Sequence, residues 1–396
     1  MRADTGLTAL LRMVAMLAAG CGPIIITPSD PTAEGSAGPS ATPGQARAAF
    51  ASPATGASAF TPLDYSFVDP SHEWALLVVS NSQGGIDLQA SSSADGGASW
   101  TTGPALATMA VGTELPVRRL LFADEYHGWA YGPALFATRD GGLSWSPVAI
   151  QGQVLSLTVV SHLALALVRL CSSAVCSLSL WTEDIQSGFW TPASRQPPSS
   201  GESGEVISLS PSAVWVLSSS QAAPYSSLAV SLDAGTSWKL LPAPTRGGRC
   251  AVTLLAAADP QNLWILCGGG PATIMMEKGL YRSSDGGQSW RLTAQASARG
   301  PTATSDSLPM VGHINSLVFT TSSRGFIALG RASLIRTGDG GATWENALPK
   351  SPEDLQAQGG ISNLMFVDEL HGWAAAGNLT ARTVDGGDSW QGLSSP

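Results

Sequence analysis

Aspartates recur along this chain at a nearly constant spacing, and they are the first residues whose chemistry needs explaining. They belong to a short cassette whose best copies read Ser/Thr-x-Asp-x-Gly-x-Ser/Thr-Trp. Calcium is a candidate ligand, but each copy offers one aspartate and no following glutamate for bidentate binding. We therefore predict a structural role, with no metal and no other cofactor. The Asp and Trp pairs are Asp95 and Trp100, Asp140 and Trp145, Asp184 and Trp190, Asp233 and Trp238, Asp285 and Trp290, Asp339 and Trp344, and Asp385 and Trp390.

The cassette contains the residue types that close a tight turn. Its glycines adopt positive φ angles without a steric penalty. Its Asp and Ser/Thr side chains can hydrogen-bond backbone amides two residues further on. Each copy is therefore predicted to be a hairpin turn, after which the tryptophan begins the returning strand and buries its ring.

The spacing of the cassettes predicts the fold. A degenerate copy at 182–190 carries one extra residue, and with it the tryptophans follow one another at intervals of 45, 45, 48, 52, 54 and 46 residues. A four-stranded propeller blade takes about 40–50 residues. We therefore predict an all-β, seven-bladed β-propeller with one cassette per blade. The expected blades are 62–107, 116–150, 153–193, 204–243, 250–294, 312–348 and 360–396.

A second phrase precedes several cassettes and supplies the first two strands of a blade. Its clearest copies are 66–74, 121–129 and 365–373, each an apolar strand, a polar turn and another strand. Five of the 13 tryptophans begin such second strands and seven end cassettes, leaving only Trp181 outside the scheme. Core packing is favoured over a sugar-stacking surface for these rings. The phrase also repeats His72, His127 and His371, which we expect to stabilise turns, since equivalent blade positions are spread around the ring.

The cassette resembles the Asp-box, or BNR repeat, of sialidases, sortilin-type receptors and photosystem II assembly-factor-like propellers. The Asp-x-x-His-Gly-Trp segments ending at Trp129 and Trp373 are similar to those of propellers related to the photosystem II stability factor. The resemblance covers residues from about 62 to 396 and implies a propeller. Sialidases share an arginine triad, a Tyr/Glu nucleophile pair and an acidic proton donor. The nearest arginine segment here, around Arg118 and Arg119, lacks their flanking pattern, and Tyr126 and Tyr131 lie within blade framework.

The chain also has no Gly-x-Ser-x-Gly and no His-Glu-x-x-His sequence. We therefore expect no enzyme activity. The alternative is a glycan-acting, sialidase-like hydrolase or a carbohydrate-binding propeller, because two carboxylates could still meet across blades.

The first 60 residues differ from the rest. A short apolar run, 13–19, follows Arg2 and Arg12, and Leu-Ala-Ala-Gly-Cys21 resembles a bacterial lipobox. That resemblance implies a signal peptide over 1–20 and lipidation of Cys21. Residues 21–61 are rich in Pro, Ala, Ser and Gly and predict a disordered tether. We expect an exported lipoprotein held to the membrane only by its lipid; a plain secretory signal is the alternative.

Four cysteines remain besides Cys21. Cys171 and Cys176 flank the turn between the second and third strands of blade three, where a bridge is sterically natural. Cys250 and Cys267 flank the first hairpin of blade five but are out of simple register. An even number of cysteines fits an oxidising compartment, with buried free thiols as the alternative.

The sequence says least about what is bound. A net charge of −9 excludes the basic patch that nucleic acid needs. The long, variable connections should lie on the face opposite the cassettes, where propellers place recognition. The candidate binding residues are Tyr225, Arg246, Arg249, Arg299, Met310 and Lys350. Solvated insertions are the alternative. We expect a monomeric, non-catalytic scaffold that binds a protein or envelope component, such as an assembly or stability factor.

Overall fold

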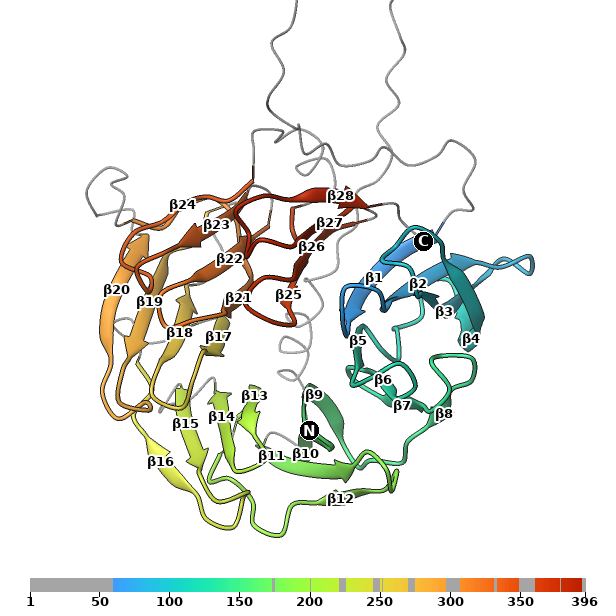
Figure 1. The fold of residues 1–396 in the computed structure, drawn as a ribbon. Coiled ribbons are helices and arrows are strands. Elements are labelled where there is room, and N and C mark those ends of the chain that lie inside the picture. Colours follow the sequence, from blue (N-terminus) through green and yellow to red (C-terminus); the bar gives the residue numbers. More distant parts are fainter. Residues whose placement is uncertain are drawn as a thin grey trace, which may run out of the picture. The chain divides into compact units, whose positions relative to one another are not determined.

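The computed structural model describes a ring of seven four-stranded sheets (Figure 1). The described residues are 60–172, 175–199, 201–220, 226–244, 250, 252–269, 275–296, 307–330, 333–348, 360–377 and 379–393. They contain strands, turns and bends, and within these ranges no helix is long and apolar enough to cross a membrane. The predicted seven-bladed, all-β propeller is confirmed.

Each blade is an antiparallel sheet whose strands follow chain order. Blades one and two comprise β1 (Phe60–Phe67), β2 (Glu73–Ser80), β3 (Gly85–Ser93), β4 (Thr101–Ala110), β5 (Arg119–Phe122), β6 (Gly128–Tyr131), β7 (Leu135–Thr138) and β8 (Ser146–Pro147). Blades three and four comprise β9 (Gln153–Val160), β10 (Leu163–Ser172), β11 (Val175–Asp184), β12 (Trp190–Pro192), β13 (Ser203–Ser210), β14 (Ala213–Ser219), β15 (Ser226–Ser231) and β16 (Lys239–Leu241). Blade five comprises β17 (Val252–Ala257), β18 (Leu263–Gly268), β19 (Lys278–Ser283) and β20 (Arg291–Ala296). Blades six and seven comprise β21 (Ile314–Phe319), β22 (Gly325–Leu329), β23 (Ser333–Thr337), β24 (Glu345–Asn346), β25 (Asn363–Phe366), β26 (Gly372–Ala376), β27 (Leu379–Thr383) and β28 (Gln391–Leu393).

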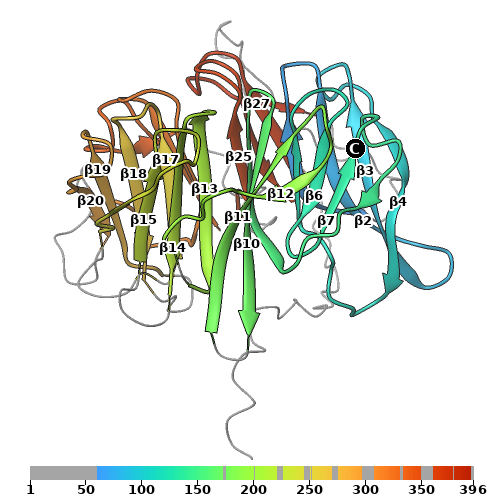
Figure 2. The ribbon, with the colours of Figure 1, turned by 90° about the horizontal axis from the view of Figure 1, so that it is seen from below.

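The first strand of every blade lines the centre of the ring (Figure 1). Figure 2 shows the strands running from one end of the ring to the other. Antiparallel order puts the turns between strands one and two at the same end as the turns between strands three and four, which hold the repeated cassette. We call that end the box face and each cassette a box. The opposite end holds the turns between strands two and three and the links between blades, and we call it the connection face.

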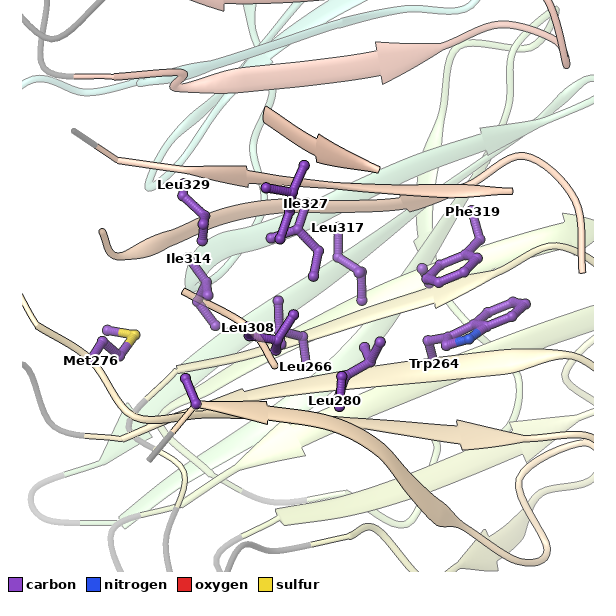
Figure 3. Packing of buried hydrophobic residues seen from close by; sticks show 14 residues of the cluster. Trp264, Leu266, Met276, Leu280, Leu308, Ile314, Leu317, Phe319, Ile327 and Leu329 are labelled. Carbon is purple, nitrogen blue, oxygen red and sulfur yellow. The ribbon is translucent and has the colours of Figure 1, made fainter. Parts of the chain in front are cut away.

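The core consists of layers between adjacent blades. Trp264 at the start of β18 stacks on Phe319 at the end of β21, with ring centroids 3.6 Å apart, and leucines and isoleucines of both blades continue the layer (Figure 3). The same relationship joins Trp74 to Phe122 at 4.0 Å. Such stacking adds to the free energy gained from burial. None of the 13 tryptophans is exposed, so the rings hold blades together.

Six of the boxes share one hydrogen-bond pattern, and the degenerate box of blade three differs from it. In blade seven, Thr383 Oγ1 donates to Asp385 Oδ1 (2.8 Å) and accepts the Gly387 amide (2.8 Å). Ser389 donates its amide to Oδ1 (2.9 Å) and its hydroxyl to Oδ2 (2.5 Å) of the same aspartate. These side-chain oxygens are thus satisfied inside the turn. In blade five, the hydrogen bonds from Ser289 lower the pKa of Asp285 to about 2.

The other repeated polar residues close the turns between strands one and two. His72 Nδ1 is hydrogen-bonded to Asp69 Oδ2 at 2.8 Å, and His127 and His371 make the same contact with the aspartate three residues earlier. In blade five Asn262 takes the place of histidine and donates to Asp259 Oδ2 at 2.8 Å. Within the described ranges, no group of three or more His, Cys, Asp or Glu side chains could hold a metal ion.

Candidate functional site

The centre of the ring holds a cavity of about 530 Å³. Its walls are the first strands of the blades, and its polar lining includes Arg119, Tyr131, Ser156, Glu205, Thr253 and Asn315. Because each first strand begins at the connection face, Arg119 and Asn315 lie near that end of the channel. These two polar side chains therefore lie toward the face where the sequence predicted recognition.

Arg119 and Asp64 form the charged pair of the channel. Arg119 Nη1 lies 3.7 Å from Asp64 Oδ1. The Asp64 side chain is 5% exposed, whereas that of Arg119 is 54% exposed. Burial raises the pKa of Asp64, and the charge of Arg119 opposes that shift. The guanidinium therefore has a free side on which it could meet an anionic or carbonyl group of a ligand.

Glu205 is the second carboxylate of the channel. Its Oε2 accepts the amide of Leu255 from the next blade at 2.9 Å. Burial raises the pKa of Glu205 to about 7, against smaller opposing effects of that hydrogen bond and of Arg119. Burial also raises the pKa of the neighbouring Tyr131 phenol, which therefore stays neutral. Glu205 is the channel residue whose charge responds to pH near neutrality.

Both carboxylates join neighbouring blades. Asp64 Oδ2 accepts the amide of Leu120 from the next blade at 2.9 Å. Similar side-chain bonds run from blade three to blade four, from six to seven and from seven to one. They are Val206 N to Ser156 Oγ (3.2 Å), Asn315 Nδ2 to Ile361 O (2.6 Å) and Asn363 Nδ2 to Tyr65 O (3.0 Å). These polar contacts join five pairs of neighbouring blades, and each of the two carboxylates accepts a backbone amide through one of its oxygens.

Three of the five second-strand tryptophans donate a hydrogen bond to the next blade's box, whereas the Nε1 atoms of Trp215 and Trp373 have no partner in the described part of the chain. Trp74 Nε1 donates to Gly141 O (2.9 Å), and Trp264 Nε1 donates to Gly340 O (3.0 Å). In blade three the degenerate box replaces this carbonyl with Glu183, which accepts from Trp129 Nε1 (2.9 Å) and pairs with Arg139. The boxes are thus contact points between blades, a role that the repeat alone did not indicate.

Two disulfides and a buried lysine order the connection face. Cys171 and Cys176 are direct partners in the β10–β11 ladder, and Cys250 is bonded to Cys267. Cys250 precedes β17, so the chain there has left the ladder and the expected register mismatch does not apply. Disulfides of this kind indicate an oxidising compartment.

Lys278 lies at the start of β19 and is fully buried. Its Nζ donates to the carbonyls of Met276 (3.0 Å), Pro309 (2.7 Å) and Met310 (3.1 Å). Burial lowers the pKa of this ammonium group to about 8. A single cation therefore holds residues 309–310 of the link between blades five and six, and Met310 is one of the predicted binding residues.

The predicted site residues are placed only in part. Met310 is half-buried beside Lys278. Tyr225, Arg246, Arg249, Arg299, Lys350 and Cys21 lie outside the described residues. Sequence reasoning missed Asp64, Glu205 and Lys278. The signal available for all three was a charged side chain within a strand.

Exposed apolar side chains lie on both faces. Those of the connection face are Val111, Leu170, Met275 and Val311. Those of the box face are Tyr126, Leu143, Phe189, Leu209, Leu232, Leu370 and Val384. The box face is therefore less uniform than its repeated turns suggested, and experiments on binding must sample it.

Fold and channel together define a seven-bladed β-propeller with a polar central channel and covalently fastened connection-face loops. Neither a family model nor a curated protein matches the sequence. Among solved structures, YCF48 bound to D1 peptide is similar at a TM-score of 0.52 with 16% identity, covering 82% of this chain and 91% of that one. YCF48 from Cyanidioschyzon merolae has a TM-score of 0.51, also at 16% identity, covering 82% and 95% of the two chains. The GH74 enzyme of Niastella koreensis is matched at a TM-score of 0.42 and 12% identity, covering 84% and 65%.

Proposed function

We propose that this protein is a non-catalytic binding propeller, exported and held to the membrane through lipidated Cys21. Its partner is a polypeptide segment of a membrane or surface complex, whose assembly or stability it supports. The segment binds at the connection face and the adjoining mouth of the channel, beside Arg119 and Met310.

One observation carries the proposal. The channel carboxylates bind backbone amides of the next blade, Asp64 that of Leu120 and Glu205 that of Leu255, while the Arg119 guanidinium is half exposed. In such a site the Arg119 guanidinium can contact a ligand, whereas Asp64 and Glu205 already accept hydrogen bonds from the protein backbone. One similar propeller holds a D1 peptide, which supports a polypeptide ligand for this shape. The disulfides support an extracytoplasmic location.

The test places a photo-crosslinking residue at single positions in the native host. Val111, Leu170 and Val311 sample the connection face, and Tyr126 and Leu143 sample the box face; all are exposed. We expect all three connection-face positions to cross-link to the same partner protein. We expect this cross-link to be lost when Arg119→Glu is added. Cross-links from the box-face positions alone would reject the proposed surface. For the anchor, Cys21→Ser is expected to release the protein from membranes.

A glycan-acting hydrolase is the second candidate, because Glu205 has a pKa of about 7 and shares the cavity with Arg119 and Tyr131. A general acid needs such a raised pKa. The test is hydrolysis of a panel of aryl glycosides and polysaccharides by wild type and Glu205→Gln. We expect no turnover by either form. Turnover that Glu205→Gln abolishes would favour the hydrolase.

A further inference from the structure

Blade five has a notch of about 440 Å³ beside its box, lined by Arg282, Ser284, Ser289, Trp290 and Arg291. Arg282 in β19 and Arg291 in β20 are direct partners in the ladder. Like charges directly opposite each other destabilise an antiparallel pair. Stability of the blade therefore does not explain why two arginines occur here.

Blade six has an arginine at the same position, and its surroundings differ. Arg336 is the ladder partner of Glu345, and its Nε donates to Glu345 Oε1 at 2.8 Å. Its Nη1 donates to Asp388 Oδ1, in the box of blade seven, at 2.7 Å. Two carboxylates thus neutralise Arg336 within the fold.

Neither carboxylate has an acidic counterpart around Arg282. Arg291 occupies the position of Glu345, and Ala342 in the box of blade six occupies the position of Asp388. The nearby acids have other hydrogen-bond partners: Asp285 accepts the hydroxyls of Ser283 and Ser289, and Asp259 accepts the side-chain amide of Asn262. Asp259 lies near enough for the charge of Arg282 to help lower its pKa, but it makes no ion pair with Arg282 within the described residues.

The guanidinium of Arg282 is held in place. Its Nη2 donates to Asn262 Oδ1 at 3.2 Å, and its central carbon lies 5.3 Å from the ring centroid of Trp264. Its Nε is buried and has no hydrogen-bond partner in the described part of the chain. A buried donor without an acceptor costs free energy, so the fold does not use all the N–H groups of Arg282.

We propose that this notch binds a compact oxyanion, a phosphate or sulfate group, between Arg282 and Arg291. The exposed Arg291 contributes a second guanidinium, and Ser284 contributes a hydroxyl from the box. Guanidinium groups match oxyanions because their parallel N–H bonds reach two oxygens at once.

Titration calorimetry with inorganic phosphate and with sulfate, at constant ionic strength set by chloride, tests the proposal. We expect one anion per chain in the wild type. Arg291→Glu, which copies the Arg336–Glu345 pair, should bind at least about tenfold more weakly, because one charge-assisted contact contributes that factor. Its thermal stability should be equal or higher. No binding above the chloride background, or equal binding by Arg291→Glu, would overturn the proposal.

A second variant builds the site elsewhere. Glu345→Arg combined with Asp388→Ala gives Arg336 the surroundings of Arg282, and we expect a second bound anion per chain. Asp388→Ala alone is the matched control and should still bind one. A stoichiometry of one in the double variant would contradict the role given to the missing carboxylates. Phosphoserine binding more tightly than inorganic phosphate would identify an esterified group as the ligand, and the reverse order would identify the free ion.

Discussion

The side-chain amide of Asn363 donates a hydrogen bond to Asp64 Oδ1 at 2.6 Å, joining residues 299 positions apart. The two lie on β25 and β1, the inner strands of the last and first blades. Each of these blades is built from one continuous segment, so no exchanged strand joins them. Side-chain contacts close the ring instead. In addition to the polar contact, the rings of Phe67 and Trp373 stack with their centroids 4.5 Å apart.

Asn363→Ala should therefore weaken ring closure. The change removes the bonds to Asp64 and to the Tyr65 carbonyl and leaves a buried carboxylate with fewer partners. The expected loss of unfolding free energy is about 1–3 kcal/mol, measured by chemical denaturation. Asn315→Ala is the control, because it removes one bond between blades six and seven and touches no charge. Equal losses in the two variants would contradict the importance of Asp64.

Glu205 makes stability depend on pH. Its pKa rises from 4.5 to about 7 on folding, so the folded chain holds the proton more tightly. Its contribution to stability is full below about pH 4.5 and is lost as the pH rises through 7. Glu205→Gln should be more stable than wild type at pH 8, by about 1–2 kcal/mol after allowing for water in the channel. The two forms should converge near pH 4.5.

Melting temperatures measured between pH 5 and 8 test this expectation. It would be refuted if the melting temperature of Glu205→Gln changed with pH as steeply as that of the wild type. Glu73 has a pKa of about 7 for the same reason, burial, and burial also raises the pKa values of Asp64 and Glu183, so these groups contribute to the slope that remains in Glu205→Gln. The box aspartates act in the opposite direction, since their lowered pKa values make stability fall only as the pH drops below about 4. The chosen range separates the two effects.

Arg139→Ala should destabilise blade three strongly. Glu183 is buried, and the change leaves its charge with only the Trp129 indole as a partner. We expect a loss of about 2–3 kcal/mol, below that of a fully buried pair because Arg139 is 41% exposed. Adding Glu183→Gln removes the charge, while the amide oxygen introduced there can still accept from Trp129, so the double variant should recover part of the loss. A double variant no more stable than Arg139→Ala would contradict this account, and thermal unfolding measures both.

The sequence predicts those parts of the fold that repeat along the chain. The box spacing gives seven blades, and Trp264 can be placed at the start of a second strand from its phrase alone. Its stacking partner Phe319 cannot be identified in this way, because that contact depends on how two blades are turned against each other.

The channel residues are harder to predict, because their contacts also depend on how separate blades are placed against each other. The register of β1 shifts between Pro62 and Asp64. Counting alternate residues from the start of the strand therefore puts Asp64 on the wrong face of the sheet. Its partners, Leu120 and Asn363, come from two other blades. Irregular links carry no repeat, and of the six binding residues predicted there the structure describes only Met310.

Lys278→Met should release the link between blades five and six without unfolding the protein. The change removes three hydrogen bonds to carbonyls at Met276, Pro309 and Met310, but it also removes a buried charge whose pKa is lowered to about 8 by burial. These effects oppose each other, so the global melting temperature should change little.

Hydrogen exchange resolves the local effect of this variant. The amides of Met276 and Leu308, which donate to Met310 O (2.9 Å) and Gln295 O (3.0 Å), should lose at least about tenfold of their protection. Lys239→Met, at an exposed position, should leave both amides unchanged. If Lys278→Met keeps full protection at these amides, the link is held by its apolar contacts, such as that of buried Leu308, and the ammonium group does not order this part of the connection face.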